Sequence, residues 1–270
     1  MNDYLQIHRA TDDVTVLHDR AEIPGLGVLP VNTFVLHSEQ PVVVDTGLST
    51  SDKDFVEQLA RVIDPADVRW IWLTHPDRDH TGGLFRLLEA APQARLVTTF
   101  VGVGILGCQW DVPLDRAFLL NPGQDLDVGD RKLSCLRPPL FDSPVTTGFL
   151  DRATGALFSS DCFGAPLADA GLAGAESVRE VADQDLRAAQ LLWAAVDSPW
   201  ARTVDRSIWH RAVGGFRSLD PSAVFSTHLP PAVGVPEALW DNLLEAPEGP
   251  EFVGPDQAAL EELLASFEPV

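Results

Sequence analysis

One short segment of the sequence carries four side chains that can bind a metal ion. The segment reads THPDRDHTGG, and its candidate ligands are His75, Asp77, Asp79 and His80. A loop can turn such side chains toward one point, where imidazole and carboxylate groups suit one or two divalent ions. The alternative is a polar loop that caps the next helix through Asp79 or Thr81. The segment directly follows the apolar run VRWIWL, which is typical of a buried strand. Because α/β folds place their functional sites at the ends of such strands, this position favours the metal site.

Further candidate ligands follow apolar runs elsewhere in the chain. Asp142 comes after LRPPLF, Asp161 after LFSS and His228 after VFST, each where a predicted strand gives way to a loop. Taken singly, the two aspartates also fit turn caps, and the histidine fits a packed side chain before a Pro-Pro loop. Asp45 ends a fourth apolar run, VVVDTG. Together, these positions predict a site assembled from loops at the ends of several strands.

The surrounding pattern predicts an α/β fold. Apolar runs broken by turn signals indicate strands over the first 45 residues, in VRWIWLTH and RLVTTF, around the turns at 128–130 and 151–155, and in AVFSTH. Helical spacing of apolar residues indicates helices after residue 51 and over 84–91, 175–196, 200–217 and 257–267. Each half of the chain should therefore contain a sheet covered by helices. We expect residues 1–270 to form a single domain with a proline-rich tail at 245–256.

Composition and charge exclude some classes of function. The 19 basic and 40 acidic residues give a net charge of −21, which opposes binding to a nucleic-acid backbone or an anionic membrane surface. The N-terminus lacks the apolar core of a signal peptide, and no apolar run is long enough to span a membrane. Three isolated cysteines argue against a disulfide framework. We therefore expect a cytoplasmic protein without nucleic-acid or membrane partners.

The order of four motifs resembles the metallo-β-lactamase fold superfamily. VVVDTG, THPDRDHTGG, SSDCFGA and STHLPP follow one another across nearly the whole chain. The resemblance implies an αββα sandwich, in which two mixed sheets lie face to face with helices on the outer faces. The details are most similar to the diiron branch of flavodiiron and oxygen-binding diiron proteins. Three features carry this closer similarity: the carboxylate at Asp77, the segment LFSSDCFGA, and the stretch WAAVDSPWARTVDRSIW before STHLPP.

The resemblance also implies a ligand set for two metal ions. One ion would take His75, Asp77 and Asp142, the other Asp79, His80 and His228, and Asp161 would bridge them. Asp45 would orient a ligand or its loop from behind. The chain departs from the branch at Asp142, because the branch has a histidine there and residues 81–209 contain none. Either Asp142 is a ligand, or that ion is held by fewer side chains and more water, with Asp142 capping the Ser143-Pro144 turn.

The donor set and the resemblance together leave three functions open. Four aspartates would neutralise two divalent ions, and an oxygen-rich set favours iron or manganese, with zinc possible. The first function is a non-haem diiron protein that binds or reduces O2 or NO, or oxidises a small substrate. The chain shows no phosphate-binding loop, so we expect no FMN in it and a separate electron donor. The second is a metallohydrolase of an ester, lactone, amide or phosphate bond. The third is a non-catalytic O2 sensor.

Overall fold

Two mixed β-sheets form the centre of the protein. The computed structural model of the chain describes residues 5–50 and 53–266. The first sheet has the strand order β1-β2-β3-β4-β5-β6-β7. Its strands are β1 (Gln6–Arg9), β2 (Val14–Ile23), β3 (Gly27–Leu36), β4 (Val42–Val44), β5 (Trp70–Trp72), β6 (Arg95–Thr98) and β7 (Ala117–Leu119). Strands β1 to β4 pair antiparallel, and β4 to β7 pair parallel.

The second sheet has the order β13-β12-β11-β10-β9-β8. Its strands are β8 (Asp125–Asp127), β9 (Lys132–Leu136), β10 (Gly148–Asp151), β11 (Ala156–Phe158), β12 (Ala223–Phe225) and β13 (Ala232–Val233). Only β11 and β12 are parallel to each other among its neighbouring strands in the described part of the chain.

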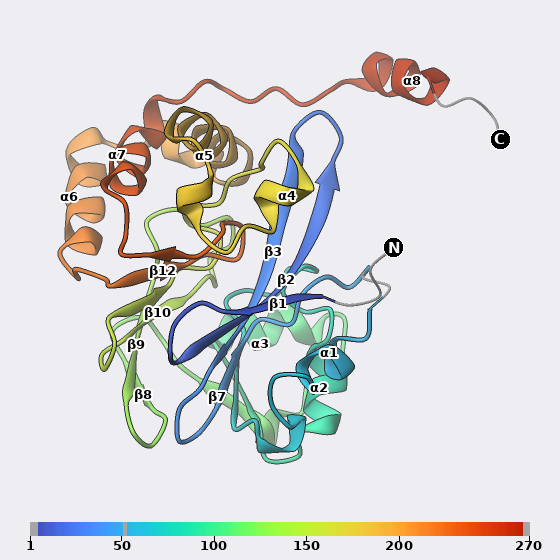
Figure 1. The fold of residues 1–270 in the computed structure, drawn as a ribbon, viewed down its shortest axis with the longest axis vertical. Coiled ribbons are helices and arrows are strands. Elements are labelled where there is room, and N and C mark those ends of the chain that lie inside the picture. The colour runs from blue at the N-terminus through green and yellow to red at the C-terminus, as the bar shows by residue number, and fades with distance from the viewer. Residues whose placement is uncertain (1–4, 51–52, 267–270) are drawn as a thin grey trace.

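Helices cover the outer face of each sheet (Figure 1). The α-helices are α1 (Phe55–Leu59), α2 (Leu84–Ala90), α3 (Phe100–Gly107), α4 (Ala170–Ala173), α5 (Asp183–Asp197), α6 (Arg206–Arg217), α7 (Glu237–Glu245) and α8 (Gln257–Ser266). Short 3-10 helices occur at η1 (Pro65–Asp67), η2 (Leu114–Arg116), η3 (Val178–Glu180), η4 (Pro199–Thr203) and η5 (Ala246–Glu248). Among residues 5–50 and 53–266, no helix is both long and apolar enough to cross a lipid bilayer.

The alternation of side chains along the strands produces the layers. Val42 and Val44 of β4 lie in the apolar cluster between the two sheets, whereas Val43 packs toward the helices, because successive strand residues point to opposite faces. Aromatic rings join the sheets across the interior: the centroids of Trp72 and Phe149 are 4.5 Å apart. The observed architecture is the αββα sandwich that the motif order implied, which confirms that prediction.

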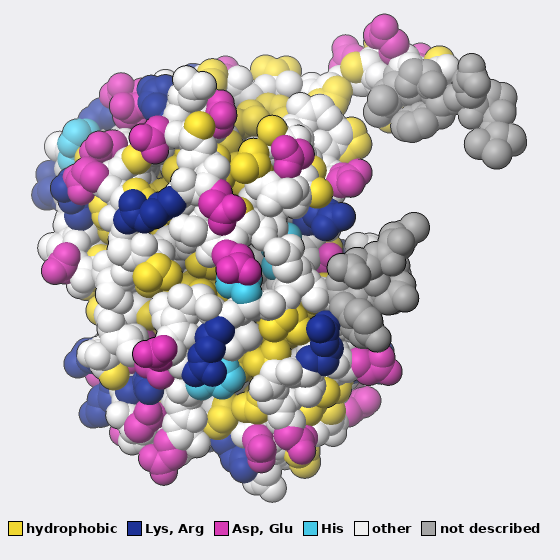
Figure 2. All heavy atoms as spheres, in the orientation of Figure 1, with side chains coloured by type: hydrophobic (Ala, Val, Ile, Leu, Met, Phe, Trp, Pro, Cys, Tyr) yellow, Lys and Arg dark blue, Asp and Glu magenta, His cyan; other side chains and the backbone are white. Residues whose placement is uncertain are grey.

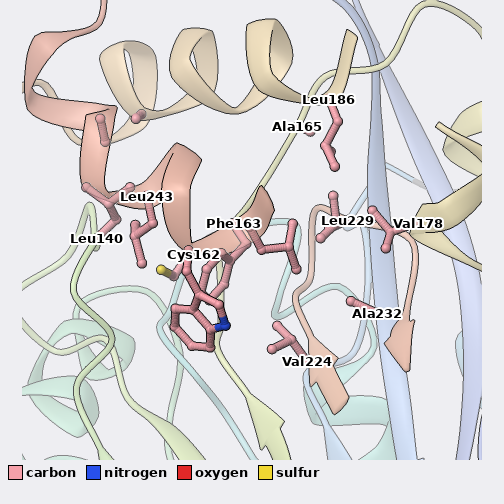
Figure 3. Packing of buried hydrophobic residues seen from close by; sticks show 14 of the residues in the cluster. Leu140, Cys162, Phe163, Ala165, Val178, Leu186, Val224, Leu229, Ala232 and Leu243 are labelled. Carbon is pink, nitrogen blue, oxygen red and sulfur yellow. The ribbon is translucent and has the colours of Figure 1, made fainter. Parts of the chain in front are cut away.

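Different helices cover the two sheets. Leu59 of α1, Leu87 of α2 and Leu106 of α3 pack in one buried cluster with residues of the first sheet. Helices α5, α6 and α7 cover the second sheet, and Figure 3 shows Leu186 of α5 and Leu243 of α7 in the cluster that contains Val224 of β12. Each sheet thus buries its outer face under its own set of helices.

Helices α3 and α7, like the four-residue α4, were not expected from the sequence. Helix α3 lies where the segment FVGVGILG follows a strand, and Thr99 caps it by accepting a hydrogen bond from the backbone N–H of Gly102 at 3.0 Å. Helix α7 lies just before the predicted proline-rich tail and overlaps it only at Glu245. It begins after Pro236 and buries Leu239 and Leu243 at helical spacing. Both patterns are shorter than the windows in which helical periodicity is clear, and tertiary packing stabilises both helices.

The C-terminal part leaves the body of the protein after η5. Within the predicted tail, Ala246 is buried in the cluster beneath α7, whereas residues 250–256 have no regular secondary structure. Figure 1 shows α8 at the end of an extended segment, away from both sheets. Residue 267, the last of the predicted helix, lies outside the described residues. Acidic side chains are spread over the visible face of the molecule, with arginines and lysines between them (Figure 2).

Candidate metal centre

The parallel strand ends bring the predicted ligands to one place. His75, Asp161 and His228 each lie three residues beyond the last residue of their strand, after Trp72, Phe158 and Phe225. Because β11 and β12 pair in parallel with Phe158 opposite Phe225, Asp161 and His228 leave the second sheet at the same edge. The paired strands β4 and β5 do the same for Asp45 and His75 in the first sheet.

All seven predicted ligands lie in overlapping groups. Each member of a group offers one ligand atom, and within a group these atoms all lie within 4.8 Å of one another. The groups are His75 with His80 and Asp161, Asp79 with His80 and His228, and His75 with Asp77 and Asp142. The structure therefore brings together every side chain that the sequence suggested, including Asp142. It also brings in one that the sequence analysis missed, since Asp197 forms a further group with Asp142 and Asp161.

Asp45 organises the segment that carries four of these side chains. Its backbone has φ 58°, in the left-handed region that aspartate tolerates better than most residues. Its carboxylate accepts hydrogen bonds from the backbone N–H and the hydroxyl of Thr74, both at 2.8 Å. It also accepts a third from His80 Nδ1 at 2.8 Å. The buried carboxylate thus fixes both ends of the 74–80 segment.

Close backbone approach also shapes the 74–80 segment. The N–H groups of Gly82 and Gly83 donate to the carbonyl oxygens of Gly47 and Thr46 at 2.9 and 3.0 Å. A Cβ at Gly82 would lie 2.3 Å from the backbone of Leu48, so only glycine fits there. Gly82 is therefore required by packing against the loop that follows β4, and Gly83 by packing against Phe55 of α1.

The three histidines share one arrangement of their ring nitrogens. His80 Nδ1 donates to Asp45, His228 Nδ1 donates to the carbonyl oxygen of Pro30 at 2.7 Å, and His75 Nδ1 lies 3.2 Å from Ser160 Oγ. Each Nε2 atom therefore points into the space between the histidines and the carboxylates. The Nε2 atoms of His75 and His80 are buried and have no hydrogen-bond partner among the described residues. Unpaired buried acceptors of this kind are what a metal ion would satisfy.

Asp161 lies between the two groups of candidate ligands. Its Oδ2 atom is 3.4 Å from His75 Nε2, while its Oδ1 atom is 3.3 Å from the Nε2 atoms of both His80 and His228. The side chain is buried, with 5% exposed. The two oxygens face different histidines, which is the geometry that a carboxylate needs to bind two ions at once. The donor set and its orphaned atoms fit a dinuclear site.

The charges of the site shift its pKa values. Burial raises the pKa of Asp161, but the three histidines outweigh burial and hold it below the usual range. For His80, burial lowers the pKa, while the carboxylates of Asp161 and Asp45 raise it well above the usual value. Asp77 has a raised pKa because of burial, with Asp142 adding to the shift. Without cations, the site is therefore held together by histidine–aspartate pairs among crowded carboxylates.

Asp142 makes contacts that fit both of its predicted roles. Its Oδ2 atom lies 3.6 Å from His75 Nε2, at the edge of the ligand cluster. Its Oδ1 atom accepts a weak hydrogen bond from Thr146 Oγ1 at 3.4 Å, within the turn that follows. The side chain is 23% exposed. The carboxylate thus reaches the position where the sequence predicted a ligand, while remaining tied to its own turn.

Helix α5 supplies the site residues that the sequence did not reveal. Trp193 donates from Nε1 to the carbonyl oxygen of Asp161 at 3.2 Å, and its ring centroid lies 5.0 Å from that of His228. Asp197 lies four residues later and joins the Asp142 side of the cluster. Burial raises the pKa of Asp197 to about 9, with the carboxylates of Asp161 and Asp142 adding to the shift. The stretch that contains both residues resembles the diiron branch, but nothing in the sequence indicated that this face of the helix meets the site.

Comparisons with known proteins agree with the fold. A family model described as the metallo-beta-lactamase superfamily matches residues 26–146. The anaerobic nitric oxide reductase flavorubredoxin of Salmonella typhi is 27% identical over 179 residues, which are 66% of this chain and 36% of that protein. The chain spans about a third of the length of the curated relatives it matches.

Solved structures of similar fold include proteins of Desulfovibrio gigas and Giardia intestinalis. The rubredoxin oxygen:oxidoreductase of Desulfovibrio gigas has a TM-score of 0.73 at 17% identity, covering 90% of this chain and 61% of that one. The flavodiiron protein of Giardia intestinalis has a TM-score of 0.74 at 16% identity, covering 90% of this chain and 59% of that one. This protein therefore has the metallo-beta-lactamase fold. More narrowly, its fold is that of the flavodiiron cores, and its sequence is similar to the flavorubredoxins.

Proposed function

We propose that this protein binds two iron ions and uses them to bind or reduce O2 or NO. The observation that carries the proposal is the position of Asp161, whose two carboxylate oxygens face different histidines. Similar proteins are named as a nitric oxide reductase, an oxygen:oxidoreductase and a flavodiiron protein, which supports a diiron site over other metals. Two iron ions would supply neighbouring one-electron centres for chemistry on a diatomic gas.

The proposed ligands divide as follows. His75, Asp77 and Asp142 hold one ion, Asp79, His80 and His228 hold the other, and Asp161 contacts both. Asp45 fixes the tautomer of His80, because its carboxylate accepts the Nδ1 proton and leaves Nε2 free to bind. Manganese and zinc also suit these donors, and the metal content decides among them.

The histidine ligands are buried, whereas two of the aspartate ligands are exposed to solvent. His75, His80 and His228 are at most 1% exposed, so the protein shields this side of the site from water. Asp77 and Asp142 are exposed, so the site opens to solvent on their side. We propose that the gas enters there and that a separate protein delivers electrons from the same side.

Two further proposals concern the protein as a whole. Residues 1–270 act as a single domain, because one apolar cluster fills the space between both sheets. The protein works in a reducing cytoplasm, which fits its three free cysteines, Cys108, Cys135 and Cys162.

Iron loading tests the proposed function. The protein is produced with iron, and its metal content per chain is measured by elemental analysis. With a chemical reductant, we expect two irons per chain and consumption of O2 or NO. Two zinc ions with hydrolysis of a chromogenic ester and no gas consumption would instead identify a metallohydrolase. Reversible O2 binding without consumption would identify a sensor.

A further inference from the structure

We propose that Asp197, the last residue of α5, is an additional metal-coordinating side chain of this site, on the side of His75 and Asp142. The inference rests on the dinuclear site proposed above and adds a ligand that the motif order does not contain. It gives the ion on the His75 side one histidine and four carboxylates. These carboxylates belong to Asp77, Asp142, Asp161 and Asp197.

The first argument is a cluster of three carboxylates, two of which also face an unpaired nitrogen. One oxygen from each of Asp142, Asp161 and Asp197 lies within 4.8 Å of the others. His75 Nε2 lies 3.4 Å from Asp161 and 3.6 Å from Asp142. This nitrogen belongs to a side chain that is 1% exposed, and it has no hydrogen-bond partner among the described residues. A cation in this space would satisfy the nitrogen and the carboxylates together.

The second argument is that α5 is held in a fixed register against the site. Gln190 Nε2 donates to the carbonyl oxygen of Phe163 at 2.8 Å, and Trp193 Nε1 donates to that of Asp161 at 3.2 Å. Residues three and four apart lie on one face of a helix, so Gln190, Trp193 and Asp197 share the face that contacts this loop. The position of Asp197 is therefore set by the same contacts that place Asp161.

The third argument is the charge at the end of the helix. Asp197 ends α5, where the helix dipole is negative and where the last turn contains no basic residue. Its Oδ2 atom accepts a hydrogen bond from Ser198 Oγ at 3.0 Å, which offsets little of this charge. An ionised carboxylate at this end, facing two more carboxylates, is unfavourable unless a cation lies among them.

The added carboxylate also changes the charge balance of the whole site. Asp197 raises the number of negative charges in the site to five, against the four positive charges of two divalent ions. The other four charges belong to Asp77, Asp79, Asp142 and Asp161. An excess of hard oxygen donors favours a hard or more highly charged ion on this side, such as manganese or ferric iron. Zinc, which prefers fewer and softer ligands, should bind there less well than at the His80 side.

Metal titration of Asp197→Asn, with Mn2+ alone as the probe, tests the proposal. The matched control is Asp185→Asn, an exposed aspartate on the same helix. We measure Mn2+ per chain and the affinity of each binding step by calorimetry. Asp197→Asn should weaken one step by roughly tenfold or more, since even an outer partner contributes about 10- to 100-fold to metal affinity. The control should bind two ions as the unchanged protein does.

The stability of the metal-free protein separates coordination from a structural role. If Asp197 binds metal, Asp197→Asn relieves repulsion, so the Tm of the metal-free form should stay the same or rise while the gain in Tm on adding Mn2+ shrinks. If Asp197 only holds Ser198, the metal-free Tm falls and both Mn2+ steps are unchanged, which overturns the inference. His228→Ala should instead weaken the Mn2+ step of the other ion, which Asp79, His80 and His228 hold.

The outcomes for the two proposals are distinct. Two unchanged Mn2+ steps in Asp197→Asn, with one step lost in His228→Ala, would reject Asp197 as a ligand and leave the dinuclear site intact. Failure of the unchanged protein to bind any Mn2+ or iron would reject both proposals. Loss of the same single step in Asp197→Asn and in Asp142→Ala would support Asp197 on the His75 side.

Discussion

His80 Nδ1 donates a hydrogen bond to Asp45 Oδ2 at 2.8 Å, and both side chains are at most 1% exposed. The contact connects the end of β4 with the segment after β5. It places Nε2 of the imidazole toward Asp161, at 3.3 Å from Oδ1. Asp45 thereby determines the tautomer and the direction of His80, a predicted ligand at the centre of the site.

Asp45→Asn should weaken metal binding without unfolding the protein. Asparagine tolerates the left-handed backbone of this position, but it carries no charge to hold the Nδ1 proton of His80. We expect a loss of about 10- to 100-fold in the affinity of one ion. The free energy of unfolding should fall by about 1–3 kcal/mol because buried hydrogen bonds weaken. Calorimetric metal titration and denaturant unfolding measure the two effects, with Asp115→Asn on the surface as control.

Asp161→Asn should reduce the metal content from two ions per chain to one or none. The carboxylate faces His75 with one oxygen and His80 and His228 with the other, whereas an amide offers a single weak donor oxygen. Elemental analysis of the purified variant gives the count directly. Two tightly held ions in this variant would show that Asp161 does not bridge them.

Asp142→Ala should remove the ion on the His75 side and leave the other. Asp142→His should keep both ions and, because the site loses one negative charge, should raise the reduction potential of bound iron. Metal counts and a redox titration of the two variants measure these effects. If Asp142 serves only its own turn through Thr146, alanine would lower stability by about 0.5–2 kcal/mol and leave the metal count unchanged.

His18 should make the protein less stable in mild acid. Asn32 Nδ2 donates to the carbonyl oxygens of Ser226 and Leu229, so its Oδ1 atom accepts from His18 Nδ1 at 2.9 Å. Burial lowers the pKa of His18 below its usual 6.5, although Asn32 partly opposes the shift. Below pH 6.5 the unfolded chain therefore takes up more protons than the folded one. The free energy of unfolding consequently decreases as the pH is lowered.

The pH effect of His18 can be isolated by substitution. His18→Gln should flatten the fall in Tm of the metal-free protein between pH 6.5 and 5, and His210→Gln, on an exposed histidine, should not. The use of metal-free protein removes the contribution of metal loss in acid. Equal slopes in both variants would mean that another group carries the acid sensitivity.

The sequence by itself determined the fold class and the predicted ligand positions. Apolar runs that end in Asp45, His75, Asp161 and His228 marked the strand ends, because a buried strand needs a continuous apolar stretch and a polar site needs the loop that follows it. Parallel pairing then placed those ends at one edge of each sheet. The apolar runs are a local pattern and could be predicted, whereas the parallel pairing of the strands was seen only in the structure.

Only the tertiary structure decided which more distant side chains join the site. Asp197 and Trp193 lie in a helix whose amphipathic pattern shows that one face is buried, but not against what. The contact of that face with the loop after β11 arises from the packing of α5 on the second sheet. The Asp45–His80 hydrogen bond and the ring orientation of His228 against Pro30 likewise join residues far apart in the chain. Such pairings depend on how layers pack, which no local spacing encodes.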